Sequence, residues 1–185
     1  MDPVTIQCLL KKHCNLPNGE KLPTLREFII AGMRNNTTTR FFCEIKSSSQ
    51  GQERGLYIAD KVYRTFTDLG AQHMVTFISF DYTILKSLVQ KDSFIDTQYL
   101  NNNKTLEDLH RDGINGANYR FPYWQKNPEL VAAAQEKGIA TNSGTVNDTL
   151  VIDWLLSQNF DYISSDEPLE VIKRSTNKKL KLFDF

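Results

Sequence analysis

The chain of 185 residues is long enough for one domain with its own hydrophobic core. Hydrophobic residues make up 40% of it, and 22 basic side chains balance 22 acidic ones, which argues against a nucleic-acid-binding protein. No apolar run approaches the roughly 20 residues that span a bilayer, and no signal peptide is visible, so we expect a soluble protein that is cytoplasmic, or secreted or periplasmic if an upstream signal was lost.

Strand-like and helix-like stretches alternate along the chain. The predicted strands are 41–46, 73–80, 96–103, 114–119, 139–146 and 160–168, and the predicted helices are 23–34, 54–70, 81–91, 126–138, 147–159 and 169–177. Thr24 and Glu27 form a capping box at the start of the first helix, and Gly70 ends the second. Asp81 is the expected N-cap of the third.

Local signals also mark the helices of the second half. Asn127 as N-cap, Pro128 at the first helical position and Gly138 past the end delimit the helix 126–138. The residues expected to be buried by the next helix are Leu150, Val151, Trp154 and Leu155. The tail 178–185 is left unassigned, and Cys8, Cys14 and Cys43 are expected to be reduced, mostly buried thiols.

This alternation predicts βα units around a parallel sheet in a single domain over residues 1–185. The sheet is either open and doubly wound or closed into a barrel. No GxGxxG or GxxxxGK[ST] motif follows a predicted strand, so the common nucleotide-binding signals of open sheets are missing and the barrel is favoured.

Polar residues gather where the predicted strands end, which is where a βα barrel has its active site. Glu44 and Lys46 are two residues apart, so they share a face that we expect to be the lumen of the barrel. The further candidates at strand ends are Ser79, Asp81, Asn118, Ser143, Thr145, Asn147, Ser165 and Asp166. The alternatives are that Glu44 and Lys46 only pair with one another or face solvent, that Asp81 and Asn147 are only helix N-caps, and that Asp166 is a plain turn residue.

Five segments in the right order carry a family resemblance: "LPTLREF", "CEIK", "ISFD", "NPELVAAAQEKGIATNSGTVND" and "FDYISSDEP". From about residue 20 to about residue 170 the chain resembles the glycerophosphodiester phosphodiesterases, which are TIM-barrel enzymes. The resemblance implies an α/β fold of the (βα)8 type that is incomplete, with about the last five or six βα units.

The resemblance also implies a chemistry, which is the hydrolysis of glycerophosphodiesters to an alcohol and glycerol 3-phosphate with a divalent metal. Glu44 inherits the role of a metal ligand, and oxygen ligands suit Mg²⁺ or Ca²⁺. Lys46 is expected beside the phosphate, where an ammonium offsets charge in the transition state. The other expected substrate or phosphate contacts are Ser79, Asp81, Asn118, Thr145 and Asn147.

The chain also departs from the family pattern. The H-R-G, E-x-D and H-D strands, which supply the acid/base histidines and two metal ligands, are not found, so no catalytic residue is identifiable and the chain looks like the C-terminal part of such an enzyme. Gly144 stands where the family has a tryptophan. Two other functions therefore remain: a non-catalytic truncated barrel that binds phosphorylated glycerol compounds, and a phospholipase-like phosphodiesterase barrel.

The expected shortage of strands has a consequence for assembly. We expect the strand 41–46 to be a free edge, which would pair with a missing N-terminal segment or exchange strands in a dimer. The isolated chain is expected to have little or no phosphodiesterase activity.

Overall fold

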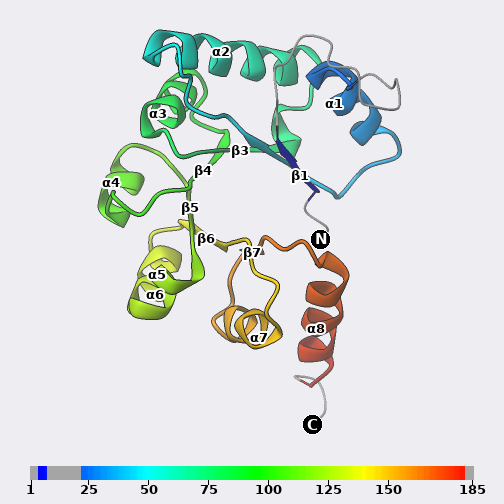
Figure 1. Cartoon of the computed structure of the whole chain (residues 1–185), viewed down its shortest axis with the longest axis vertical. Coiled ribbons are helices and arrows are strands. Elements are labelled where there is room, and N and C mark those ends of the chain that lie inside the picture. The colour runs from blue at the N-terminus through cyan, green and yellow to red at the C-terminus, as the bar shows by residue number, and fades with distance from the viewer. Residues whose placement is uncertain (1–3, 8–21, 182–185) are drawn as a thin grey trace. The chain divides into compact units, whose positions relative to one another are not determined.

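The computed structural model describes residues 4–7 and 22–181, which belong to two compact units that meet in sequence between Asp96 and Thr97. The elements of the first unit are β1 (Val4–Gln7), α1 (Leu25–Met33), β2 (Phe41–Glu44), α2 (Gln52–Asp68), the 3₁₀ helix η1 (Gln72–Met74), β3 (Val75–Ser79) and α3 (Tyr82–Lys91) (Figure 1). Its three strands pair in parallel and in chain order, with Phe41 of β2 opposite Val4 and Val75.

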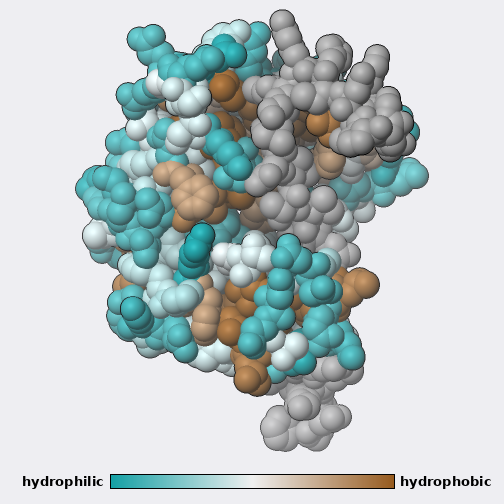
Figure 2. Space-filling view, viewed as in Figure 1, coloured by the Kyte–Doolittle hydropathy of each residue, from teal (hydrophilic) through white to brown (hydrophobic). Residues whose placement is uncertain are grey.

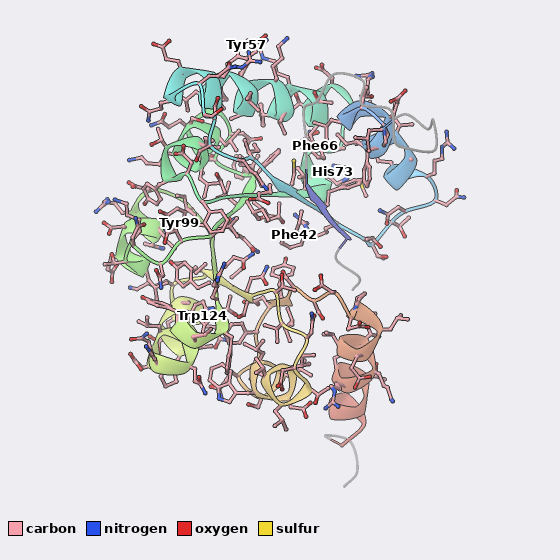
Figure 3. All side chains as sticks on the ribbon, in the orientation of Figure 1. Phe42, Tyr57, Phe66, His73, Tyr99 and Trp124 are labelled. Atoms are coloured by element: carbon pink, nitrogen blue, oxygen red, sulfur yellow. The ribbon has the colours of Figure 1, made fainter. Side chains whose placement is uncertain are left out.

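The two faces of these strands differ in what they contact. Phe41, Cys43 and Ile45 are buried in one core cluster with residues of α1, α2 and α3. The ring of Phe66 on α2 meets that of Phe41 edge to face at 5.9 Å between centroids. Phe42 lies on the other side of the strands from Phe66 (Figure 3), as the alternation of side chains along a strand requires. Glu44 therefore shares the face of Phe42, away from the helices.

The second unit repeats the alternation of strands and helices. They are β4 (Asp96–Tyr99, whose first residue still belongs to the first unit), α4 (Leu106–Arg111), β5 (Gly116–Tyr119), α5 (Phe121–Lys126), α6 (Glu129–Glu136), β6 (Ala140–Ser143), α7 (Thr149–Ser157), β7 (Tyr162–Ile163) and α8 (Pro168–Lys181). Parallel pairing places Tyr99 opposite Ala117, and Asn142 opposite both Asn118 and Tyr162. No helix in the described ranges is long and apolar enough to cross a membrane.

Trp124 of α5 is the centre of the helix-covered core of this unit. Its side chain is fully buried, its ring stacks on Tyr119 at 5.2 Å, and Phe160 meets it edge to face. The indole Nε1 donates a hydrogen bond of 3.0 Å to the main-chain oxygen of Asn142 (Trp124 is labelled in Figure 3). Because Tyr119 faces Trp124, its neighbour Asn118 faces the opposite side of the strand.

Most predicted ends are confirmed, because they depend on contacts within one turn. Thr24 and Glu27 form the capping box of α1, and the Asp81 carboxylate accepts from the first N–H groups of α3. Gly70 adopts φ 67° just past α2, where a glycine is favoured. Cys43 is buried, as expected, while Cys8 and Cys14 lie outside the described residues.

The predicted N-cap at Asn127 is wrong. Its side chain instead donates a hydrogen bond of 2.8 Å to the Tyr123 carbonyl, and α6 begins at Glu129 with Pro128 in the cap position. The cause is α5, a short helix that the sequence pattern did not reveal and that ends at Asn127.

The predicted burial of Leu150 is also wrong. Asp148 caps α7, and the helix turns Ile152 and Leu155 inward while Leu150 stays 77% exposed. Val151 and Trp154 are half-buried, and Leu155 is buried as predicted. Exposed apolar side chains of this kind interrupt a described surface that is mostly hydrophilic on the face shown in Figure 2.

The prediction that the stretch 41–46 is a free edge strand is also wrong. The strand β1 was not predicted, and its parallel pairing covers β2, so the stretch 41–46 is not the free edge. The six predicted strands are all present, although 160–168 shortens to Tyr162–Ile163.

Candidate functional site

Glu44 and Lys46 lie at the carboxyl end of β2. Glu44 is the last residue of the strand and is half-buried on the face away from the helices. Ile45 follows on the helix-covered face, 2% exposed, and Lys46 is exposed. Glu44 is thus on the face opposite the helices, and the roles of Glu44 and Lys46 in a site stay predictions.

Ser79 and Asp81 hold the end of β3 together. The Ser79 hydroxyl, fully buried, donates to the Ile45 carbonyl at 2.6 Å and accepts from Asp81 N–H at 3.0 Å. One Asp81 carboxylate oxygen accepts from Thr83 N–H at 3.0 Å at the start of α3. These bonds fix the chain next to Glu44 and Lys46. Ser79 and Asp81 therefore have a structural role, whether or not they touch substrate.

Asn118 belongs to a group of buried amides in the second unit. Its Nδ2 donates to Gln98 Oε1 at 3.3 Å, and Asn142 Nδ2 donates to the same oxygen at 2.9 Å. The Ser164 hydroxyl donates to Asn142 Oδ1 at 3.3 Å. Asn118 was predicted from the sequence as a site residue, whereas Gln98 and Asn142 were not. A signal was present, since each amide is the residue before the last of a short strand: "DTQY", "GANY" and "ATNS".

Asn147 ties the loop after β6 to the loop after β7. Its Oδ1 accepts from Asp166 N–H and from the Ser165 hydroxyl at 3.0 Å each, and its Nδ2 donates to the Asp166 carboxylate at 2.9 Å. The alternative that Asn147 is the cap of α7 is wrong, because Asp148 has that role. Thr145 and Asn147 are both exposed at this strand end, while Ser143 is buried.

Gly144 has no room for a side chain. A Cβ at this position would lie 2.4 Å from Ser164 Cβ and 3.1 Å from the Ser164 main-chain oxygen. The departure from the tryptophan of the family pattern is therefore matched by close backbone packing.

The histidines that the structure describes lie at the other ends of the strands. His73 is exposed in η1, just before β3, and His110 is exposed on α4, before β5. His13 lies outside the described residues. No group of three or more His, Cys, Asp or Glu side chains able to hold a metal occurs within residues 4–7 and 22–181. Glu44 alone does not complete a metal centre, so the described donor set does not fit a bound divalent ion by itself.

The chain is similar in sequence and in fold to known proteins. The model of the glycerophosphoryl diester phosphodiesterase family matches residues 7–170. A glycerophosphodiester phosphodiesterase from Parabacteroides distasonis is similar with a TM-score of 0.84 and 25% identity over 90% of this chain and 69% of its own. Among curated proteins, no sequence matches the chain.

Two further solved structures share the fold at lower identity. A putative glycerophosphoryl diester phosphodiesterase from Silicibacter pomeroyi has a TM-score of 0.75 and 18% identity over 87% of this chain and 58% of its own. A phosphodiesterase from Oleispira antarctica, solved with the product sn-glycerol-3-phosphate, has a TM-score of 0.66 and 19% identity over 83% of this chain and 61% of its own. The predicted fold class, an α/β fold of the incomplete TIM-barrel type, is confirmed.

Proposed function

Because the chain belongs to the glycerophosphoryl diester phosphodiesterase family, we propose that it serves the metal-dependent hydrolysis of glycerophosphodiesters to an alcohol and glycerol 3-phosphate. The observation that carries this proposal is the position of Glu44, which ends a buried strand on the face away from the helices. The bound sn-glycerol-3-phosphate of the Oleispira antarctica structure is the product expected from such a reaction.

In this proposal the charged pair of β2 acts on the phosphate. Glu44 would supply one carboxylate to a divalent ion, Mg²⁺ or Ca²⁺, and the bound ion would offset negative charge on the phosphoryl oxygens. Lys46 is exposed, and its ammonium would offset negative charge on the same oxygens. Ser79 and Asp81 support this end of the strand through their main-chain hydrogen bonds.

The polar strand ends of the second unit are the proposed contacts for the rest of the substrate. Thr145 is exposed and Asn118 has an amide group at the end of its strand. Asn147 orders the loop beside Thr145 through three hydrogen bonds. Any direct contact of Asn147 with substrate would compete with these bonds.

The described residues do not provide the whole reaction. The remaining metal ligands and the acid/base groups would have to come from outside residues 4–7 and 22–181, because the described histidines lie at the amino-terminal ends of β3 and β5. General acid/base catalysis contributes roughly 10²- to 10⁴-fold to a rate. The same observation favours a second candidate function, the non-catalytic binding of phosphorylated glycerol compounds.

Release of glycerol 3-phosphate from glycerophosphocholine, with Mg²⁺ or Ca²⁺ added, tests whether the 185-residue chain needs further catalytic groups. We expect little or no turnover by this chain, and weak binding of glycerol 3-phosphate by calorimetry; clear turnover would rule out the non-catalytic function. The Lys46→Met variant should bind it at least about tenfold more weakly, since a charge-assisted hydrogen bond contributes about 1.5–3 kcal/mol. Lys61→Met, on the exposed face of α2, is the matched control and should bind normally. Equal binding by the two variants would remove Lys46 from the phosphate site.

Pairing with another chain or segment stays a prediction. Because β1 is the first strand in the strand order of its unit, any recruited strand would add to β1 rather than to β2. Light scattering on the purified chain would show whether it is a dimer.

A further inference from the structure

Three amide side chains form one layer at the carboxyl ends of adjacent strands in the second unit. Gln98, Asn118 and Asn142 are the residues before the last of β4, β5 and β6, and they are 2%, 8% and 1% exposed. Gln98 Oε1 accepts from Asn142 Nδ2 at 2.9 Å and from Asn118 Nδ2 at 3.3 Å. The layer is therefore neutral and joined through a single oxygen atom.

The surroundings leave Gln98 little freedom. A Cβ on Gly116 would lie 2.4 Å from Gln98 Cγ and 3.1 Å from Gln98 Cβ, so the glutamine chain lies directly against the glycine backbone of β5. Asn142 is held from two sides, because Ser164 donates to its Oδ1 and Trp124 donates to its main-chain oxygen. Such packing fixes the amide planes before any ligand arrives.

Two polar atoms of this layer are left over. Gln98 Nε2 and Asn118 Oδ1 make no hydrogen bond within the described residues, although their side chains are more than nine-tenths buried. Neither atom is among the polar atoms sealed from solvent without a partner. Buried polar groups are normally hydrogen-bonded, so these two atoms are suited to a partner that reaches them from outside the protein.

The chemistry of the two atoms defines the partner. One donates and the other accepts, which matches a hydroxyl group because a hydroxyl does both. If the nitrogen and oxygen of all three amides are exchanged, the roles of Gln98 and Asn118 are exchanged too, and one donor and one acceptor are still left. A phosphate oxygen is an acceptor, so it would meet Asn118 Oδ1 unfavourably, and the layer offers no positive charge for it.

We propose that Gln98 and Asn118 form a subsite for an alcohol hydroxyl of the substrate, which is a hydroxyl of the glycerol part if the proposed function holds. Gln98 donates to the hydroxyl oxygen, the hydroxyl donates to Asn118 Oδ1, and Asn142 and Gly116 position Gln98. A substrate that lacks the hydroxyl leaves both buried amides without a partner, and such sites discriminate strongly.

The test compares ligands that differ only in hydroxyl groups. Binding of sn-glycerol 3-phosphate and of propyl phosphate to the full chain is measured by calorimetry. The side-chain NH₂ resonances of Gln98 and Asn118 are followed by NMR and assigned from the variants. We expect glycerol 3-phosphate to bind about tenfold more tightly, since two neutral hydrogen bonds contribute roughly 1 kcal/mol or less each, and to shift both NH₂ signals. Propyl phosphate should leave these signals unchanged.

The variants Gln98→Met and Asn118→Leu keep the side-chain volumes and remove the amides. Each should reduce the tenfold preference to about threefold, because each removes one of the two hydrogen bonds that are the source of the difference. Gln125→Met, an exposed position on α5, should keep the tenfold preference. Retention of the preference in both amide variants would overturn the subsite.

Failure of the proposed function gives a different result. If neither phosphate binds, glycerol alone is titrated against the unmodified chain with propan-1-ol as control. Shifts of the Gln98 and Asn118 signals by glycerol only would support the subsite and count against the phosphate site. The absence of such shifts would overturn the subsite even if one of the variants failed to fold.

Discussion

Gly116→Ala adds only one methyl group but should clearly lower the free energy of unfolding of the second unit. The added methyl carbon would lie 2.4 Å from Gln98 Cγ and 3.0 Å from the Thr97 main-chain oxygen. The second contact involves backbone, which cannot turn away as a flexible side chain can. The neighbouring strand has to shift, or Gln98 has to leave its place against β5.

The cost follows from two sources. Overpacking a well-filled site typically costs about 1–3 kcal/mol. A displaced Gln98 also weakens its hydrogen bonds to Asn118 and Asn142, each of which contributes about 1 kcal/mol. We therefore expect a loss of about 3 kcal/mol in the free energy of unfolding of this unit.

Gly55→Ala is the matched control. Gly55 lies inside α2, and a Cβ there would meet Ile84 Cδ1 at 3.6 Å, which is an ordinary contact. Because glycine is a poor helix former, this change should stabilise the first unit by about 0.5–1 kcal/mol and leave the unfolding midpoint of the second unit unchanged.

Tryptophan fluorescence during urea unfolding is the assay. Both tryptophans of the chain, Trp124 and Trp154, lie in the second unit, so the signal reports on that unit. With a denaturant slope of about 1–3 kcal/mol per molar urea, a loss of about 3 kcal/mol lowers the midpoint by about 1–3 M. An unchanged midpoint in Gly116→Ala would refute the close packing of Gln98 on β5.

Three further predictions test the packing and the charges of the two units. Ile152→Ala should lower the free energy of unfolding by about 3 kcal/mol, whereas Leu150→Ala should change it by less than about 0.5 kcal/mol. The reverse order in urea melts would mean that Leu150 faces the core, as predicted from the sequence. Asp161→Ala should cost about 2 kcal/mol by the same assay, because its carboxylate accepts from the N–H and hydroxyl of a buried threonine at 2.8 and 3.0 Å. The hydrogen bond from Lys91 holds the pKa of Asp60 below its ordinary value. The ion pair therefore stabilises the fold at pH values above the unfolded-state pKa of Asp60, and this contribution is lost as the pH falls through the folded-state pKa. Lys91→Met should reduce the difference between the free energies of unfolding at about pH 7 and about pH 3. An unchanged difference would count against the ion pair.

Local contacts explain why much of the fold was predictable. The capping box of Thr24 and Glu27 and the glycine turn at Gly70 need only a few neighbouring residues, and both are present. The six-residue helices α4 and α5 are too short to show a helical period, so the sequence pattern did not reveal them. In α7 the run "TLVIDWLL" is apolar on several faces, and only tertiary packing selects Ile152 over Leu150.

Some residues of the candidate site could likewise be predicted from the sequence and others could not. Glu44 was found because an acidic residue at the end of an apolar strand is a local anomaly and matches a family motif. Gln98 and Asn142 were missed because they are 44 residues apart in the chain and come together only because β4 and β6 both lie beside β5. The exchange of tryptophan for Gly144 was visible in the sequence, while the close approach of Ser164 to this position is visible only in the structure.

The most direct test of the account is a map of backbone amide shifts when sn-glycerol 3-phosphate and Mg²⁺ are added to the isotope-labelled chain. In the first unit we predict the largest shifts at Glu44, Ile45 and Lys46, at the carboxyl end of β2, because the charged pair there is the proposed phosphate and metal contact. Gln72 and His73, which precede β3 at the opposite end of the neighbouring strand, should not shift. Shifts at Gln72 and His73 without any at Glu44 to Lys46 would contradict the proposed site.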